Sequence, residues 1–301
     1  MQNFAPIALF VYNRPTHTER TLKFLKQNEL APESRLFLFS DGPKTPADKK
    51  NVDEVRELLR NLDGFKSVEV IERQENMGLA NSVIAGVSRL VQDYGQVIVM
   101  EDDLISSPYL LTYFNQALAR YRDEEKVMHI GAYMYNLKET SLPETFFYRA
   151  ATSWGWATWD RAWKHFQPDV DVLISQFDAS KRNAFSIEHS MNFWKQLQGF
   201  KNGKNDSWAI RWYASIFLRQ GLTLNPCHSL VNNIGHDGSG VHSGINDIYH
   251  VIINPKPITW FPDELKEDAD AYAAIKEFLS NRKGSIWQRI KRFISASWPL
   301  K

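Results

Sequence analysis

The stretch Val97-Ile98-Val99-Met100-Glu101-Asp102-Asp103-Leu104 decides how the rest of the sequence is interpreted. Its four leading apolar residues predict a short strand that is buried on both faces. The strand ends in three consecutive carboxylates, which repel one another unless a cation neutralises them, so a hard divalent metal such as Mn²⁺ or Mg²⁺ fits there. Ligands bind at the carboxyl ends of parallel strands, where such a metal would meet a phosphate. A solvated acidic turn is the simpler interpretation of the same residues.

The first 120 residues alternate between strand and helix patterns. Buried strands are predicted at 7–12, 36–39, 68–71 and 97–100, and helices at 18–27, at 47–62, from about 79 to 91, and after Ser106-Ser107-Pro108, where Ser supplies a cap and Pro the first turn. This alternation predicts an α/β fold with a mostly parallel sheet and helices on both faces.

Polar residues follow each predicted strand. Arg14, Asp41, Asn76 and the 101–103 group each come just past a carboxyl end, so a parallel sheet would bring them to one rim. Arg14 can pair with phosphate, and Asp41 can accept from a ribose hydroxyl or a base N–H. Asp41-Gly42-Pro43 is also ordinary turn chemistry. No glycine-rich phosphate loop of either familiar spacing is present, which excludes a P-loop protein and an ordinary dinucleotide-binding protein.

Composition excludes several other classes. The 301 residues are 43% apolar and 24% charged, enough for one large domain, and the formal net charge of +1 offers no basic field for nucleic acid. The single cysteine, Cys227, excludes an internal disulfide and fits a reducing compartment. No apolar run approaches the length of a membrane span, so we expect a cytoplasmic protein.

The stretch Ser153 to Trp163 carries four tryptophans and Asp160. Trp154 and Trp156, separated by one glycine, suit an aromatic platform for a sugar, with the Asp160 carboxylate beside it. A tryptophan-rich core wedge explains the same residues.

A second acidic candidate follows a predicted helix at 186–200. The polar loop 201–205 delivers Asp206 just before a helix that carries Trp208, Trp212 and Tyr213. Asp206 could act on an acceptor, or it could simply be the N-cap of that helix.

The end of the chain adds a late strand predicted at 223–231 and a loop at 232–244 that is rich in glycine. Such a loop can lay backbone N–H groups on phosphate, and either His236 or His242 could complete a metal shell or be merely solvated. Residues 285–298 form a basic amphipathic pattern, which suits an anionic membrane surface or packing on the body of the protein.

On the donor side the sequence resembles nucleotide-sugar glycosyltransferases of the GT-A fold. The likeness is to the N-acetylglucosaminyltransferase family that starts hybrid and complex N-glycans, and to bacterial family 2-like sugar transferases, over about residues 7–244. Asn13-Arg14-Pro15-Thr16 is similar to that family's Asp-Arg-Ser-Thr turn, whose Arg contacts the nucleotide, and Ser40-Asp41 to its Gln-Asp, whose Asp holds uracil or ribose. Asn76 stands where the family has a base-contacting His.

The acidic strand gives the most specific match, because residues 97–104 are similar to the family's Val-Ile-Val-Val-Glu-Asp-Asp-Leu. The resemblance implies that Asp103 binds manganese directly and that Asp102 lies against the sugar and ribose. Asp206-Ser207-Trp208 resembles the family's Asp-Asp-Trp, which implies that Asp206 is the general base. Asp160 is a second candidate for this role, because its tryptophan-rich setting could also present an acceptor.

Two further segments resemble elements of the same family, one that contacts the acceptor and one that folds over the diphosphate. Gly155-Trp156 resembles a Gly-Trp element that contacts the acceptor, which points to Trp154, Trp156 and Trp208 as acceptor-binding residues. Gly240-Val241-His242-Ser243-Gly244 resembles a Gly-Val-Ser-His-Gly loop over the diphosphate, which implies a nucleotide contact at Val241 and a metal contact at His242.

The predicted protein is an inverting transferase that uses Mn²⁺ or Mg²⁺ and a nucleoside-diphosphate sugar, with a UDP-sugar favoured. Residues 1–125 would bind the donor, 126–260 would bind the acceptor within the same domain, and 261–301 would form a tail that could contact the inner face of the plasma membrane. The expected acceptor is a saccharide or lipid-linked saccharide in bacterial surface polysaccharide or oligosaccharide synthesis. A nucleotidyltransferase of related fold and a non-catalytic carbohydrate-binding protein are the two alternatives.

Overall fold

The computed structural model describes residues 4–139, 141–235 and 247–282. One eight-stranded sheet runs through the molecule in the order β3-β2-β1-β4-β8-β6-β9-β7, and a two-stranded ribbon pairs β10 with β5. The strands are β1 (Ile7–Val11), β2 (Arg35–Ser40), β3 (Ser67–Glu72), β4 (Gln96–Glu101), β5 (Leu104–Ser106), β6 (Val127–Gly131), β7 (Thr145–Tyr148), β8 (Trp156–Trp159), β9 (Leu222–Pro226) and β10 (Val231–Asn233).

The direction of the strands confirms the predicted fold class. β1 to β4 are mutually parallel, β6 and β9 run the same way, and only β7 and β8 are antiparallel to their neighbours in this sheet. β1, β2 and β4 consist mainly of apolar residues because both of their faces are covered, whereas in β3, at the edge of the sheet, apolar residues alternate with exposed polar residues.

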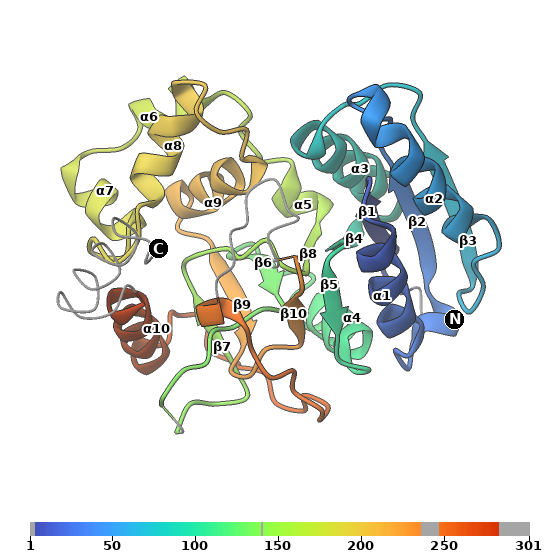
Figure 1. Ribbon diagram of the computed structural model, residues 1–301. Helices are drawn as coiled ribbons and strands as arrows, with labels where there is room; N and C mark the ends of the chain where they lie inside the picture. Colours follow the sequence, from blue (N-terminus) through green and yellow to red (C-terminus); the bar gives the residue numbers. More distant parts are fainter. Residues whose placement is uncertain (1–3, 140, 236–246, 283–301) are drawn as a thin grey trace, which may run out of the picture.

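Helices cover both faces of the sheet (Figure 1). Two side chains of β8 point to opposite faces near the middle of the sheet. The Trp159 indole N–H donates to the carbonyl oxygen of Leu118 in α4 (Leu110–Arg120), whereas the Trp156 ring stacks on Trp208 in α9 (Trp208–Leu218). α4 therefore lies on one face, together with α1 and with α2, which packs on α1. α9 lies on the other face, together with α3, which packs on both α5 and α9. The helices are α1 (Pro15–Lys26), α2 (Lys49–Arg60), α3 (Leu79–Tyr94), α4 (Leu110–Arg120), α5 (Asp160–Trp163), α6 (Val170–Ser175), α7 (Ala179–Phe185), α8 (Phe193–Lys201), α9 (Trp208–Leu218) and α10 (Ala269–Asn281).

Three predicted elements differ from the structure. The helix expected after Ser106 begins only at Leu110, because residues 104–106 form β5 and pair with β10. The helix expected at 186–200 is interrupted by the left-handed residues Ile187, Glu188 and His189, so that α7 ends before them and α8 begins after them. The strand expected at 223–231 is split between two sheets as β9 and β10. The amphipathic pattern at 285–298 lies outside the described residues.

Helix α3 packs tightly on the parallel strands at Gly86. The Phe10 ring of β1 stacks on the Phe39 ring of β2, with centroids 4.9 Å apart. A Cβ at Gly86 would lie 2.8 Å from Phe10 Cζ and 3.0 Å from Phe39 Cζ, which is closer than atoms pack in a folded core. Glycine therefore sets the distance between helix and sheet.

We predict that Gly86→Val destabilises the protein by about 1–3 kcal/mol, because the added atoms overpack a filled site. Valine is a better helix former than glycine, so propensity alone would give the opposite sign. The matched control is Ala85→Val on the exposed side of the same helix, which should cost less than about 0.7 kcal/mol. Urea unfolding of both variants checks this, and equal effects would show that Gly86 is not tightly packed.

Candidate active site

The carboxyl ends of β1, β2 and β4 bring the predicted donor-side residues together. The backbone N–H of Tyr12, which follows β1, donates to Asp102 Oδ2 at 3.2 Å, after the end of β4. Arg14 Nη2 donates to Asp102 Oδ1 at 2.5 Å and to Asp103 Oδ2 at 3.0 Å. The predicted convergence of Arg14 with the acidic group on one rim is therefore observed.

The acidic group is held in a setting that resists negative charge. Asp102 and Asp103 are only 4% and 8% exposed, so the solvated-turn interpretation is wrong. Burial, together with the charges of Asp103 and Asp102, raises the pKa of Glu101 to about 8. Burial also raises the pKa of Asp102, against the opposing effect of the Arg14 guanidinium. A positive charge at this rim is therefore strongly stabilising.

The rim carries the features of a site for one hard cation. Asp103 Oδ1 is buried and has no hydrogen-bond partner among the described residues, so one carboxylate oxygen remains available for a ligand. Over residues 4–139, 141–235 and 247–282, no three His, Cys, Asp or Glu side chains gather around one point. A single carboxylate fits Mg²⁺ or Mn²⁺ in sites where substrate phosphates and water complete the shell. Val241, His236 and His242 lie outside the described residues.

Asp41 anchors the loop between β3 and α3. Its Oδ1 accepts the backbone N–H groups of Gly42 at 3.0 Å and Met77 at 2.9 Å, and its Oδ2 accepts that of Gly78 at 2.9 Å. Asn76 completes the junction, because its Nδ2 donates to the carbonyl oxygen of Gly42 at 2.8 Å. The turn interpretation of Asp41 is therefore observed, and the carboxylate fixes two loops next to the acidic rim.

A segment that the sequence marked only as glycine-rich closes over the carboxylates. The backbone N–H of Ile234 donates to the carbonyl oxygen of Asp103 at 2.8 Å. A Cβ at Gly235 would lie 2.4 Å from Asp103 Oδ2 and 2.8 Å from Arg14 Nη1. Only glycine can pass so close, and the signal for it is the glycine-rich stretch after β10.

The tryptophans separate into a core group and a rim residue. Trp156 is fully buried and stacks on Trp208, itself 4% exposed, with centroids 5.2 Å apart. These two indoles form the core wedge, and no sugar can reach their faces without repacking. Trp154 is only partly buried and makes an edge contact with Tyr133 at 4.5 Å. Because Gly155 packs on Met100, Trp154 lies at the same end of β4 as the acidic group.

Asp160 and Asp206 fall at different ends of the sheet. The N–H of Asp160 donates to the carbonyl oxygen of Gly95, immediately before β4. At about 3.3 Å per strand residue, this places Asp160 on the order of 20 Å from Asp102. The reserve assignment of Asp160 as a catalytic group is therefore wrong, because the antiparallel pairing of β8 with β4 carries it to the opposite edge.

Asp206 lies toward the carboxyl rim and is exposed. Trp208, two residues further on, stacks on Trp156, whose backbone pairs with Val99 near the end of β4. The interpretation of Asp206 as an N-cap is wrong, because the Ser207 side chain accepts the N–H of Ile210 and caps α9 instead. Asp206 is thus left outside the helix, with its carboxylate at the surface.

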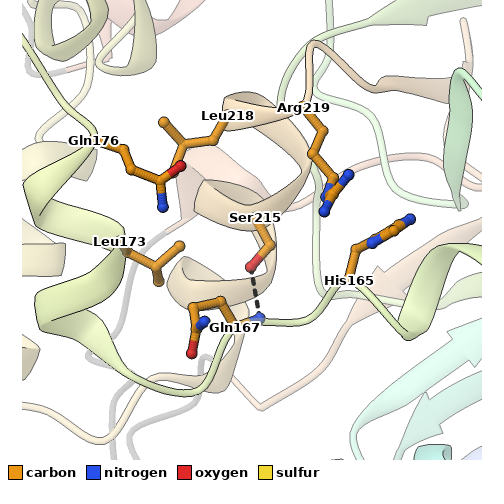
Figure 2. A pocket seen from close by; sticks show the side chains of 7 residues that line it. All are labelled: His165, Gln167, Leu173, Gln176, Ser215, Leu218 and Arg219. Carbon is orange, nitrogen blue, oxygen red and sulfur yellow. Dashed lines mark hydrogen bonds between the residues drawn. The ribbon is translucent and has the colours of Figure 1, made fainter.

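A cavity of about 440 Å³ lies away from this rim, between α6, α9 and the segment after α5 (Figure 2). Figure 2 shows Ser215 at its base, where the hydroxyl accepts the N–H of Gln167 at 3.0 Å. Neither His165 nor Arg219 is buried, and partial burial together with the charge of Arg219 lowers the pKa of His165, which favours the neutral imidazole. The remaining lining residues are Leu173, Gln176 and Leu218.

We predict that Asp41→Asn destabilises the protein by about 1–3 kcal/mol, because an amide N–H₂ would replace an oxygen that accepts a buried backbone N–H. Asp53→Asn, at an exposed position of α2, is the matched control and should stay within about 0.5 kcal/mol. Urea unfolding measures the loss, and amide hydrogen exchange should speed up at Met77 and Gly78. Unchanged exchange at these two amides would contradict the anchoring role.

In the described part of the chain, no helix combines the length and apolar character needed to cross a membrane. A comparison with curated protein sequences finds no match. The solved structures to which the chain is similar include the following three. The mannosyltransferase PcManGT from Pyrobaculum calidifontis, solved with GDP-Man and Mn²⁺, is 10% identical, covering 72% of this chain and 73% of its own, with a TM-score of 0.38.

Mouse xyloside xylosyltransferase 1 is 11% identical over 70% of this chain and 80% of its own, with a TM-score of 0.35. TarS from S. aureus is 14% identical over 46% of this chain and 23% of its own, with a TM-score of 0.30.

The family comparison covers the strand ends that carry Arg14 and the acidic group. The family model described as glycosyl transferase family 2 matches residues 7–165, which is just over half of the chain and extends from β1 to the end of the tryptophan-rich stretch. The match includes Arg14, Asp41 and the acidic group after β4. The match favours a glycosyltransferase over the two alternatives, a nucleotidyltransferase and a non-catalytic carbohydrate-binding protein. The chain therefore belongs to glycosyl transferase family 2 and is a nucleotide-sugar glycosyltransferase.

Proposed function

We propose that the protein transfers a sugar from a nucleoside-diphosphate sugar, with a UDP-sugar favoured, to a saccharide acceptor with inversion at the anomeric carbon. One observation carries the proposal. In a family 2 chain, the buried carboxylates of Asp102 and Asp103 lie at the carboxyl end of a parallel strand, with Asp103 Oδ1 unpaired among the described residues. That arrangement suits a cation with a diphosphate beside it.

On this proposal Asp103 holds Mn²⁺ or Mg²⁺, and His242 is a second candidate ligand from the sequence alone. Bound there, the ion would supply the charge that a departing nucleoside diphosphate needs. The protein's own groups do the remaining work. Arg14 pairs with phosphate, Asp102 lies against ribose and sugar, and Asp41 with Asn76 fixes the loops around the base.

Asp206 is the proposed general base. Its exposed carboxylate, placed toward the rim and free of a capping role, can take the proton of an acceptor hydroxyl as that oxygen attacks the anomeric carbon. Trp154 is the proposed acceptor contact, since it is partly exposed at the same end of β4 and is held edge-on by Tyr133. Trp156 and Trp208 support these two residues from the core and are not carried into the proposal.

The wider role rests on the sequence. A lipid-linked saccharide acceptor and a part in bacterial surface polysaccharide or oligosaccharide synthesis remain predictions. Contact of the basic pattern at 285–298 with an anionic membrane surface remains a prediction too, as does a contact of Val241 with the nucleotide.

We predict that Asp206→Asn lowers kcat by about 10²–10⁴-fold, because the loss of a general base removes that much rate. Donor affinity, measured by titration with UDP and Mn²⁺, should stay unchanged. The matched control is Asp160→Asn, an exposed aspartate at the opposite edge of the sheet, which should retain full turnover. Near-normal turnover of Asp206→Asn would eliminate Asp206 as the base, and a large loss in the control would contradict the placement of Asp160.

A further inference from the structure

Arg14 is the counter-charge of the acidic rim in the described structure. Its Nη2 contacts both Asp102 Oδ1 and Asp103 Oδ2, and the side chains of the two acids are only 6% and 11% exposed. Two buried carboxylates this close require a cation, since an unpaired buried charge is costly. The neighbouring acids raise the pKa of Arg14 although burial lowers it, so the guanidinium is always charged.

The Asp103 carboxylate, which Arg14 contacts, is also the proposed ligand of the divalent ion. Oδ2 of Asp103 is held by Arg14, and Oδ1 is the oxygen without a partner among the described residues. A second cation on this carboxylate would be repelled by the guanidinium across a weakly screened, buried site. Gly235 packs against both Asp103 Oδ2 and Arg14 Nη1, so the arginine has little room to turn aside there.

The stem of Arg14 nevertheless allows it to serve a different anion. Its carbonyl oxygen accepts the N–H of Thr18 at 2.9 Å and the Thr18 hydroxyl at 2.9 Å, which fixes the backbone at the start of α1. Pro15 follows at the first helical position. The backbone is thus held while the guanidinium ends a flexible chain, and a guanidinium pairs with phosphate as well as with carboxylate.

We propose that the Arg14 guanidinium takes the role of the metal as counter-charge when no nucleotide is bound, and so makes metal binding depend on the nucleotide. The inference rests on the proposed function. Without nucleotide, Arg14 competes with the divalent ion for Asp103, and the ion binds weakly. A diphosphate offers the guanidinium a new anionic partner, which releases Asp103 to the ion. Metal and nucleotide then raise each other's affinity by one common factor, as thermodynamic linkage requires.

The test is the affinity for Mn²⁺ alone, measured from free Mn²⁺ by electron paramagnetic resonance in the absence of nucleotide. Arg14→Gln removes the competing charge and should bind Mn²⁺ about 5–150-fold more tightly than the wild type, the usual range of such couplings. Arg14→Lys keeps the charge and should restore weak binding. Arg89→Gln, an exposed arginine on α3, controls for the change in net charge.

The unfolding temperature is a second measurement, which still tests the proposal if Arg14→Gln is poorly stable. Arg14→Gln leaves the two acids without a counter-charge, so its unfolding temperature should be low and should rise with Mn²⁺ alone, whereas that of the wild type should respond only with UDP present. If Arg14→Gln binds Mn²⁺ no more tightly than the wild type, and its unfolding temperature ignores Mn²⁺, the proposal about Arg14 is overturned.

Failure of the proposed function gives a different result. Asp103→Asn added to Arg14→Gln should abolish the Mn²⁺ response. If Mn²⁺ binding with UDP survives Asp103→Asn in the wild-type background, the metal site itself is misplaced. If that binding is lost while Arg14→Gln has no effect, only the arginine proposal fails.

Discussion

The burial of negative charge at the end of β4 is the constraint on which the site depends. Carboxylates that are removed from water must be compensated, and the groups that β1 and the turn after it present to Asp102 and Asp103 supply that compensation. β1 delivers a backbone N–H from Tyr12 and the guanidinium of Arg14, and the parallel pairing of β1 with β4 fixes both at the right height. Burial, and after it the charges of Asp103 and Asp102, raise the pKa of Glu101, so the rim resists further negative charge.

The rest of the fold arranges the surroundings of this rim. Asp41 ties the loop after β3 to the end of β2 by accepting two backbone N–H groups of that loop, those of Met77 and Gly78, and this fixes the two loops beside the rim. On the other side, the stacked indoles of Trp156 and Trp208 join the sheet to the start of α9 and so position Asp206. A rigid core thus connects two surface residues, Trp154 and Asp206, to a buried charged centre.

The sequence predicted the parallel half of the fold well and the second half poorly. Apolar runs that end in polar residues are local signals, and they located β1 to β4 together with Arg14, Asp41 and the acidic group. The positions of Asp160 and Trp156 depend on the pairing of β8 with β4, and the structure of residues 104–106 depends on the pairing of β10 with β5. Both pairings join segments far apart in the sequence, so no local pattern predicts them. The three left-handed residues that end α7 carry no glycine to announce them.

The central claim is that the buried carboxylates form a metal-dependent site for a nucleoside diphosphate. It is tested most directly by thermal unfolding with UDP, GDP, CDP or dTDP, each with and without Mn²⁺, in the wild type and in Asp103→Asn. A ligand at about 100 times its dissociation constant adds about 2.7 kcal/mol of stability. The account predicts a rise for one nucleotide that requires Mn²⁺ and is lost in Asp103→Asn. A rise that ignores both the metal and Asp103, or no rise with any nucleotide, would contradict it.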